Sequence, residues 1–294
     1  MYTQVAANKR KTVYLMLAFI ILLSVLGWVF AQAYGTPVIT IFVLGFALTY
    51  SLISYFASSK IALALTGATE VSKKEAPELY RTVENLAITA GLPTPKVYII
   101  QDAAPNAFAT GRDPEHAVVA VTTGLLEILN EQELEGVLAH ELSHIGNYDI
   151  RVMAIVIMLV TVIGLVSDFF LRMTFWGGDR DRGGNAFAIL GLVAAIVAPF
   201  VAMLLRLAVS RKREFLADAS GALLTRYPEG LASALNKIAG SKQEMKHANS
   251  ATAHLFISNP LKQRKKPGAF ARLFSTHPPT EERVEALQKM ETKL

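Results

Sequence analysis

Two histidines and a glutamate stand at a spacing that suits metal chemistry. His140 and His144 flank Glu141 in the stretch His-Glu-Leu-Ser-His. On a helix, residues four apart lie on one face, so the two imidazoles can bind one Zn²⁺ ion. Glu141 can then take a proton from a water bound to that metal. The alternative is a chance match on a surface helix, which six histidines in 294 residues make uncommon.

A catalytic zinc site needs a third protein ligand and an open position for water. The metzincin pattern has a third histidine six residues after the second, where this chain has Ile150. A carboxylate on a later helix is the other option, and Glu214 is the candidate. Asp218 shares its helical face and could accept the free ring N–H of a metal-bound histidine. The opposing interpretation is that Glu214 pairs with neighbouring basic side chains on a solvated helix.

The composition indicates a membrane protein. Hydrophobic residues make up 52% of the chain and charged residues 18%, whereas soluble domains carry about 25% charged residues. The net charge of +5 fits lysines and arginines that flank membrane spans. No basic stripe interleaved with aromatic residues is present, so we expect no nucleic-acid partner. Cysteine is absent, so a metal must be bound by histidine or carboxylate side chains.

Four apolar runs predict four transmembrane helices. The first two are Val13–Phe30 and Val38–Phe56, each close to the roughly 20 residues that cross a bilayer. The second pair is Val152–Ser167, which is short and could be re-entrant, and Ala186–Leu205. A cleaved signal peptide is disfavoured for the first run, because that run is long and leads directly into a second span.

These runs divide the chain into four segments. We expect a transmembrane hairpin in residues 1–60, the first part of a cytoplasmic domain in 61–150, a second hairpin in 151–208, and the second part of the domain in 209–294. Lysines and arginines concentrate on one side of this arrangement. Both termini and the domain are therefore predicted to be cytoplasmic.

The soluble segments predict a small α+β unit. A helix is expected over Pro77–Ala90. Asn130 and Glu133 predict the capped start of a central helix that carries both histidines and ends at Gly146. Two strands and a possible edge strand are predicted at Lys96–Gln101, Ala117–Thr122 and Pro105–Gly111.

Three separated motifs occur in a fixed order along the chain. They are His140–His144, then Arg213–Asp218 after two apolar runs, then Thr276–Arg283. Together with the hairpins they resemble the HtpX family of bacterial membrane zinc metalloproteases, which are relatives of the CAAX prenyl proteases. The resemblance covers nearly the whole chain. It implies a mainly α membrane protein with four transmembrane helices and an α+β zincin-like cytoplasmic metalloprotease domain that contains a small sheet.

The resemblance also implies which residues form the site. One Zn²⁺ per chain would be bound by His140, His144 and Glu214, with Glu141 as the catalytic base.

Further residues are implied around the metal. Asp218 and Arg283 would lie beside the ligands, and His277 would donate to the oxyanion if it points inward. Substrate backbone would add as a strand along an edge segment. That segment consists of Asn106, Ala107, Phe108 and Ala109.

The remaining histidines are weaker candidates. His116 is expected in an exposed turn, and His247 and His254 in a mobile polar region. The basic stretch Lys262–Lys266 could contact anionic lipid, or could be a solvated loop.

The expected function is hydrolysis of peptide bonds in misfolded or damaged membrane proteins at the bacterial cytoplasmic membrane. The expected partners are those substrates and the lipid bilayer, and the oligomeric state is left open. The alternatives are a CAAX-type prenyl protease, a polytopic transporter, and a scaffold with a non-catalytic zinc site. A transporter needs ionisable residues inside its spans, and the first, second and fourth runs have none. An intact Glu141 argues against a scaffold.

Overall fold

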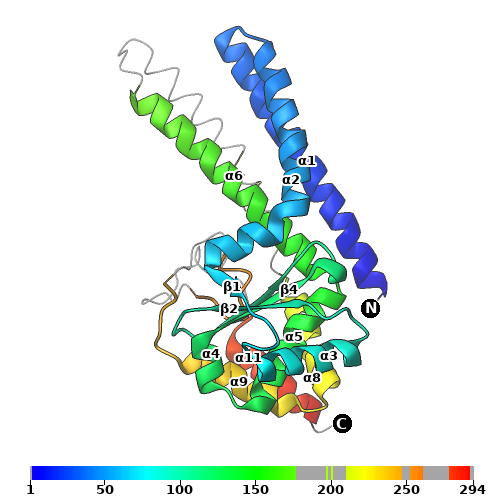
Figure 1. The fold of residues 1–294 in the computed structure, drawn as a ribbon. Helices are drawn as coiled ribbons and strands as arrows, with labels where there is room; N and C mark the ends of the chain where they lie inside the picture. The colour runs from blue at the N-terminus through cyan, green and yellow to red at the C-terminus, as the bar shows by residue number, and fades with distance from the viewer. Residues whose placement is uncertain are drawn as a thin grey trace.

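Three long helices extend from a body built of shorter helices and one small sheet (Figure 1). They are α1 (Tyr2–Tyr34), α2 (Val38–Thr66) and α6 (Asp149–Trp176). This computed structural model describes residues 2–176, 197, 200, 210–246, 252–260 and 278–291. α1 and α2 form an antiparallel pair, and α6 packs against both where it leaves the body.

Two of the long helices are apolar enough to cross a membrane. Gln4–Val29 in α1 has a mean hydropathy of 2.4, and α2 has one of 1.9. Large apolar side chains on both are exposed, for example Phe42 at 74% and Ile21 at 63%. Such contiguous apolar surface is unfavourable in water and suits a lipid environment. The chain is therefore a membrane protein, and its first two predicted spans are confirmed as long apolar helices.

The other two predicted spans are less fully described. Val152–Ser167 falls within α6, which follows α5 after a bend of 80°. Ala186–Leu205 lies outside the described residues apart from Val197 and Phe200. A four-span architecture therefore stays a prediction.

The sheet has four strands in the order β1-β2-β4-β3. Their bounds are β1 (Ala68–Glu70), β2 (Lys96–Ile100), β3 (Ala107–Thr110) and β4 (Val118–Thr122). β2 and β4 are parallel, and the two outer pairs are antiparallel. All five residues of β4 are buried, as expected for a strand covered on both faces. The predicted strands are confirmed, and β3 is an edge strand as the sequence suggested.

The helices that surround the sheet are short and have clear boundaries. α3 ends at Gly91 in the left-handed conformation, with φ of +67°. α5 begins with a capping box in which Asn130 and Glu133 bond each other's backbone N–H. The helices of the body are α3 (Pro77–Ala90), α4 (Thr123–Ile128), α5 (Glu131–Gly146), α8 (Arg211–Thr225), α9 (Pro228–Gly240) and α11 (Thr280–Glu291), with a 3₁₀ turn η1 at Pro114–His116.

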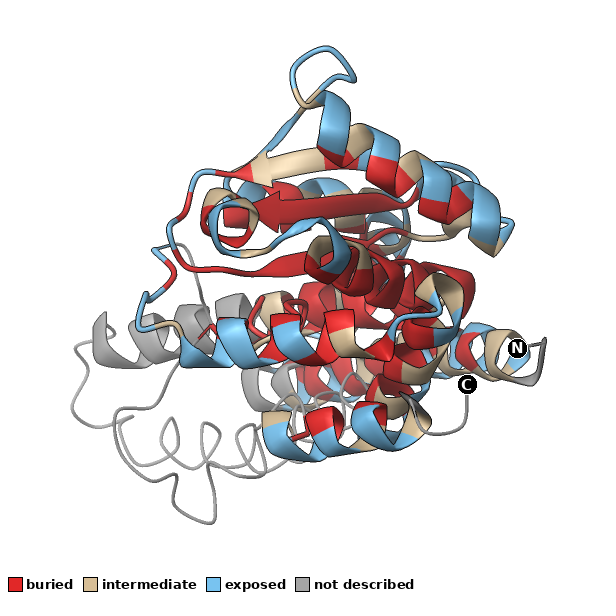
Figure 2. Cartoon of the chain, turned by 90° about the horizontal axis from the view of Figure 1, so that it is seen from below, coloured by how far each residue is buried: buried red, intermediate tan, exposed pale blue. Residues whose placement is uncertain are grey.

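The core lies between the sheet and α5. Val119 and Val121 of β4 pack with Leu138 and Leu142 of α5, all of them at most 1% exposed. Buried residues gather on the sheet and on the helices directly against it (Figure 2). α8 and α9 cover the opposite side of α5, so every residue from Gly136 to Asn147 is buried. Because burying an uncompensated charge is costly, the polar side chains of α5 require partners from other elements.

Candidate metal centre

The two histidines of α5 bring their Nε2 atoms together. These atoms lie 3.2 Å apart, and the two rings are nearly perpendicular. Glu214 of α8 approaches the same point, with Oε1 3.6 Å from Nε2 of His144. One ligand atom from each of the three residues lies within 4.8 Å of the others, and all three side chains are buried. The structure thus brings together all three residues predicted as ligands.

The spacing of these atoms fits a tetrahedral metal. Zinc–ligand bonds of about 2.1 Å at tetrahedral angles place two ligand atoms roughly 3.4 Å apart. The 3.2 Å and 3.6 Å separations bracket that value. Two imidazole nitrogens and one carboxylate oxygen are also the donor set of open, catalytic zinc sites. The buried group can therefore hold a divalent metal ion.

Each histidine has a carboxylate behind it. Nδ1 of His144 is 3.1 Å from Oδ2 of Asp149, and Nδ1 of His140 is 2.9 Å from Oδ1 of Asp218. The second contact is close but is not aligned as a hydrogen bond. A carboxylate at Nδ1 fixes the tautomer that presents the Nε2 lone pair to a metal. Asp218 therefore lies in the position expected from the sequence, beside a candidate metal ligand.

Asp149 is a residue of the candidate site that the sequence reasoning missed. It comes five residues after the second histidine and opens α6. The bend between α5 and α6 turns its side chain back onto the site. The available signal was an acidic residue directly after the predicted end of the central helix.

Arg283 of α11 neutralises Asp218. Its Nε and Nη2 atoms donate to the two oxygens of that carboxylate at 2.8 and 2.6 Å, and Nη1 donates to the carbonyl of Ile257 at 3.1 Å. Both charged side chains are 2% exposed. Burial alone would raise the pKa of Asp218, but the charge and hydrogen bonds of Arg283 outweigh it and lower the pKa to about 2. A permanent carboxylate thus stands behind His140.

Glu141 is buried beside the ligands. Burial raises the pKa of its carboxyl group to about 7, and the charge of His144 opposes that rise. The carboxylate accepts a hydrogen bond from the backbone N–H of Ala109 in β3. A carboxyl group with a pKa near neutrality can both accept and return a proton, as a general base must.

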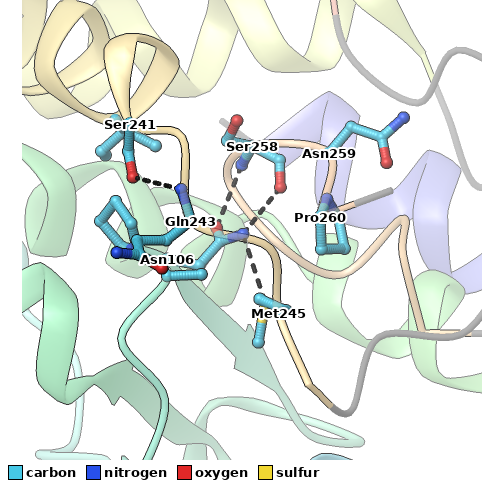
Figure 3. A pocket seen from close by; sticks show the side chains of 10 residues that line it. Asn106, Ser241, Gln243, Met245, Ser258, Asn259 and Pro260 are labelled. Carbon is cyan, nitrogen blue, oxygen red and sulfur yellow. Dashed lines mark hydrogen bonds between the residues drawn. The ribbon is translucent and has the colours of Figure 1, made fainter. Parts of the chain in front are cut away.

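The edge segment 106–109 does not face open solvent. The carbonyl of Ala107 accepts a 2.9 Å hydrogen bond from the N–H of Ile257. The side chain of Asn106 bonds both the N–H and the carbonyl of Ser258 (Figure 3). Phe108 turns into the interior, where its ring meets the edge of Phe256 at 5.2 Å. Substrate addition along this edge requires residues 252–260 to move, and the substrate-binding assignment stays a prediction.

The other four histidines differ in where the structure places them and in whether it describes them. His277 and His247 lie outside the described residues. His254, expected in a mobile region, is instead 2% exposed and packs among buried neighbours. His116 stands in η1 with its Nδ1 2.6 Å from Asp113, in the exposed turn that was expected.

Gly221 allows α8 to approach α5 closely. A Cβ atom there would lie 2.9 Å from the backbone nitrogen of His140, which no side-chain rotation can relieve. We expect Gly221→Ala to destabilise the protein by about 1–3 kcal/mol and to weaken zinc binding, because α8 would carry Glu214 away from the histidines. Thermal unfolding with and without zinc measures both effects. Gly240→Ala is the matched control, since a Cβ at this helix end meets nothing within 4 Å. Equal melting temperatures for the two variants would contradict the expectation.

Zinc binding should release a proton at neutral pH. Burial lowers the pKa of His144, but the hydrogen bond to Asp149 and the charge of Glu214 outweigh it and raise the pKa to about 9. Burial lowers the pKa of His140 to about 4. A histidine ligand must be neutral, so His144 has to lose its proton when a metal binds.

The apparent zinc affinity should therefore rise about tenfold per pH unit between pH 6 and 9. Isothermal titration calorimetry in two buffers of different ionisation enthalpy would count the released protons. The same heat of binding in both buffers would contradict this assignment.

A buried His-His-Glu donor set, with a glutamate at its side and apolar helices leading away from it, defines a membrane-bound metallopeptidase. The chain matches peptidase family M48 over residues 73–291. It therefore belongs to that family, and the resemblance to HtpX proteins seen in the motifs is confirmed.

Curated relatives match along nearly their full length. A protease HtpX homolog of Tropheryma whipplei (strain Twist) is 50% identical, with 99% of this chain and 98% of the relative covered. A protease HtpX homolog of Streptococcus gordonii is 45% identical, with 99% and 100% covered. Among solved structures, S. mikatae Ste24p has a TM-score of 0.51 at 20% identity, covering 98% of this chain and 67% of that protein. This last likeness concerns the fold alone.

Proposed function

We propose that the chain is a zinc-dependent endopeptidase of the bacterial cytoplasmic membrane that hydrolyses misfolded or damaged membrane proteins. The observation that carries the proposal is the buried group of His140, His144 and Glu214 with Glu141 at its side. Membership of peptidase family M48 and the protease name of its relatives support it.

The residues of the site supply a complete proton route. When bound, zinc would polarise a water molecule and the scissile carbonyl, and would lower the pKa of the water towards about 7. Glu141 takes the proton of the attacking water and passes it to the leaving amine. Asp149 and Asp218 keep the two imidazole rings oriented, with Nε2 directed at the metal position. A scaffold would need no such buried base.

The proposal includes a topology. α1 and α2 form the first hairpin, α6 begins the second, and both termini and the protease body are cytoplasmic. The abrupt passage from α5 into α6 supports this arrangement, because it places the metal ligands next to a long apolar helix. Substrates would then reach the site from the membrane surface.

Metal removal tests this function. The purified full-length chain should cleave a detergent-solubilised, partly unfolded membrane protein. A chelator should abolish cleavage, and a stoichiometric amount of zinc should restore it, because the donor set contains two nitrogens and is a poor site for magnesium. Continued cleavage by protein shown to be free of zinc would refute the proposal.

A further inference from the structure

Asn8, near the start of α1, contacts Asp149, the carboxylate behind His144. Its side chain is completely buried, although Lys9, Arg10 and Lys11 follow it directly on the helix. Nδ2 donates to Oδ1 of Asp149 at 2.7 Å and to the carbonyl of Asn147 at 2.9 Å. A buried amide is costly unless it forms such bonds. Among the described residues only the Nδ2 atom of the Asn8 side chain has partners, so its contacts with Asp149 and Asn147 are what hold the side chain in place.

The two carboxylate oxygens of Asp149 have different partners. Oδ2 faces Nδ1 of the metal-binding His144 at 3.1 Å. Oδ1 receives the amide of Asn8, and Nε of Arg213 lies 3.4 Å from the same atom. Arg213 directly precedes the ligand Glu214. Asn8 of α1 thus binds one oxygen of the carboxylate, while the other oxygen orients His144.

The turn directly before Asp149 needs such support. Tyr148 has a φ of +61°, a left-handed conformation that is strained for a residue with a bulky side chain. Strained residues persist only where the surroundings hold them. Lys9 lies over the ring of Tyr148 at 4.5 Å, and Arg151 approaches the same ring at 4.9 Å. Two consecutive residues of α1 therefore contact two consecutive residues at the start of α6: Asn8 contacts Asp149, and Lys9 contacts Tyr148.

We propose that Asn8 is a positioning residue of the metal site, which acts by fixing Asp149 and through it the ring of His144. The cytoplasmic end of the first membrane helix, 141 residues before Asp149, is then part of the metal centre and not only an anchor. This inference rests on the proposed zinc site and adds a structural requirement to it. Zinc retention depends on the docking of α1.

The test compares zinc retention in full-length variants in detergent. Asn8→Ala removes the amide, and Asn8→Leu removes it while keeping the branched shape of the side chain. Partners of metal-bound histidines contribute 10–100-fold to metal affinity, so we expect each variant to raise the zinc dissociation constant and the rate of zinc transfer to a chelator about tenfold. The absorption bands of the cobalt-substituted protein should change as well, since the His144 ring would turn.

Ser24→Ala is the matched control on the same helix. It removes the hydroxyl that donates to the carbonyl of Ile20 at 2.7 Å, and it has no contact with the site. Its zinc affinity should equal that of the wild type.

A double-mutant cycle decides whether Asn8 acts through Asp149. Asp149→Asn should weaken zinc binding, and adding Asn8→Leu to it should have little further effect, because residues in one hydrogen-bond network are not additive. Full additivity would overturn the proposal. So would a lower melting temperature of the zinc-free Asn8→Leu protein with unchanged zinc affinity, which is the signature of a purely structural residue.

The outcome also separates this inference from the proposed function. Wild-type protein that binds no zinc would overturn both. Wild-type protein that binds zinc, with Asn8→Leu binding it equally well, would overturn the inference alone.

Discussion

Glu141→Gln should abolish peptide cleavage while leaving zinc bound. The glutamine amide cannot accept the proton of the attacking water, and general base catalysis contributes about 10²–10⁴ in rate. Its carbonyl oxygen can still accept the hydrogen bond from Ala109, so the local structure should hold. The candidate ligands His140, His144 and Glu214 are untouched. The measurement is the rate of cleavage of a detergent-solubilised membrane protein, together with the zinc content of both proteins.

His140→Ala is the companion variant that separates chemistry from metal binding. It removes a ligand, so both zinc and activity should be lost. Self-cleavage during purification gives a second readout, because an active wild type should produce fragments that the Glu141→Gln protein does not. Cleavage by the Glu141→Gln protein at the wild-type rate would show that Glu141 is not the base.

Arg283→Met should be among the most destabilising substitutions in the chain. Methionine fills much of the same volume but leaves the carboxylate of Asp218 buried without its partner. Removing one member of a buried ion pair costs about 3–5 kcal/mol. The carbonyl of Ile257 loses its donor as well. The free energy of unfolding, measured by denaturant titration in detergent, should fall by that amount.

An exposed ion pair on the same helix provides the control. Lys289 and Glu285 of α11 form an exposed i,i+4 ion pair, with side chains 72% and 64% exposed. Lys289→Met should leave the stability nearly unchanged, because solvent screens exposed pairs. Arg283→Lys tests the geometry, since an ammonium cannot reproduce the two parallel hydrogen bonds to Asp218. Wild-type stability in Arg283→Met would contradict the buried pair as described.

Local sequence was sufficient for the strands and helices of the body and for the candidate ligands. Asn130 and Glu133 predicted the capped start of α5, and the four-residue spacing of the histidines places both on one face of it. Such predictions succeed because caps, turns and helical periodicity are set by neighbours within a few residues. Glu214 was a candidate on the same grounds, and the structure brings it to the histidines.

Arg283 and His254 show where local reasoning stops. An arginine on a polar helix is usually solvated, and only the family resemblance pointed it towards the site. It can be buried because Asp218, 65 residues away, compensates its charge. His254 is a second example. Nothing in its polar sequence neighbourhood predicted that its side chain would be 2% exposed.

The sequence by itself determined the candidate chemical groups of this protein: two histidines four residues apart, a glutamate beside the first of them, and a later carboxylate, on helices between apolar runs. Tertiary structure alone decided what supports that chemistry. Asp149 reaches His144 only because the chain bends by 80° after α5. Asn8 reaches Asp149 only because α1 docks beside that bend. Neither contact leaves a periodic signal in the sequence, because each joins residues that only the packing of separate helices brings together.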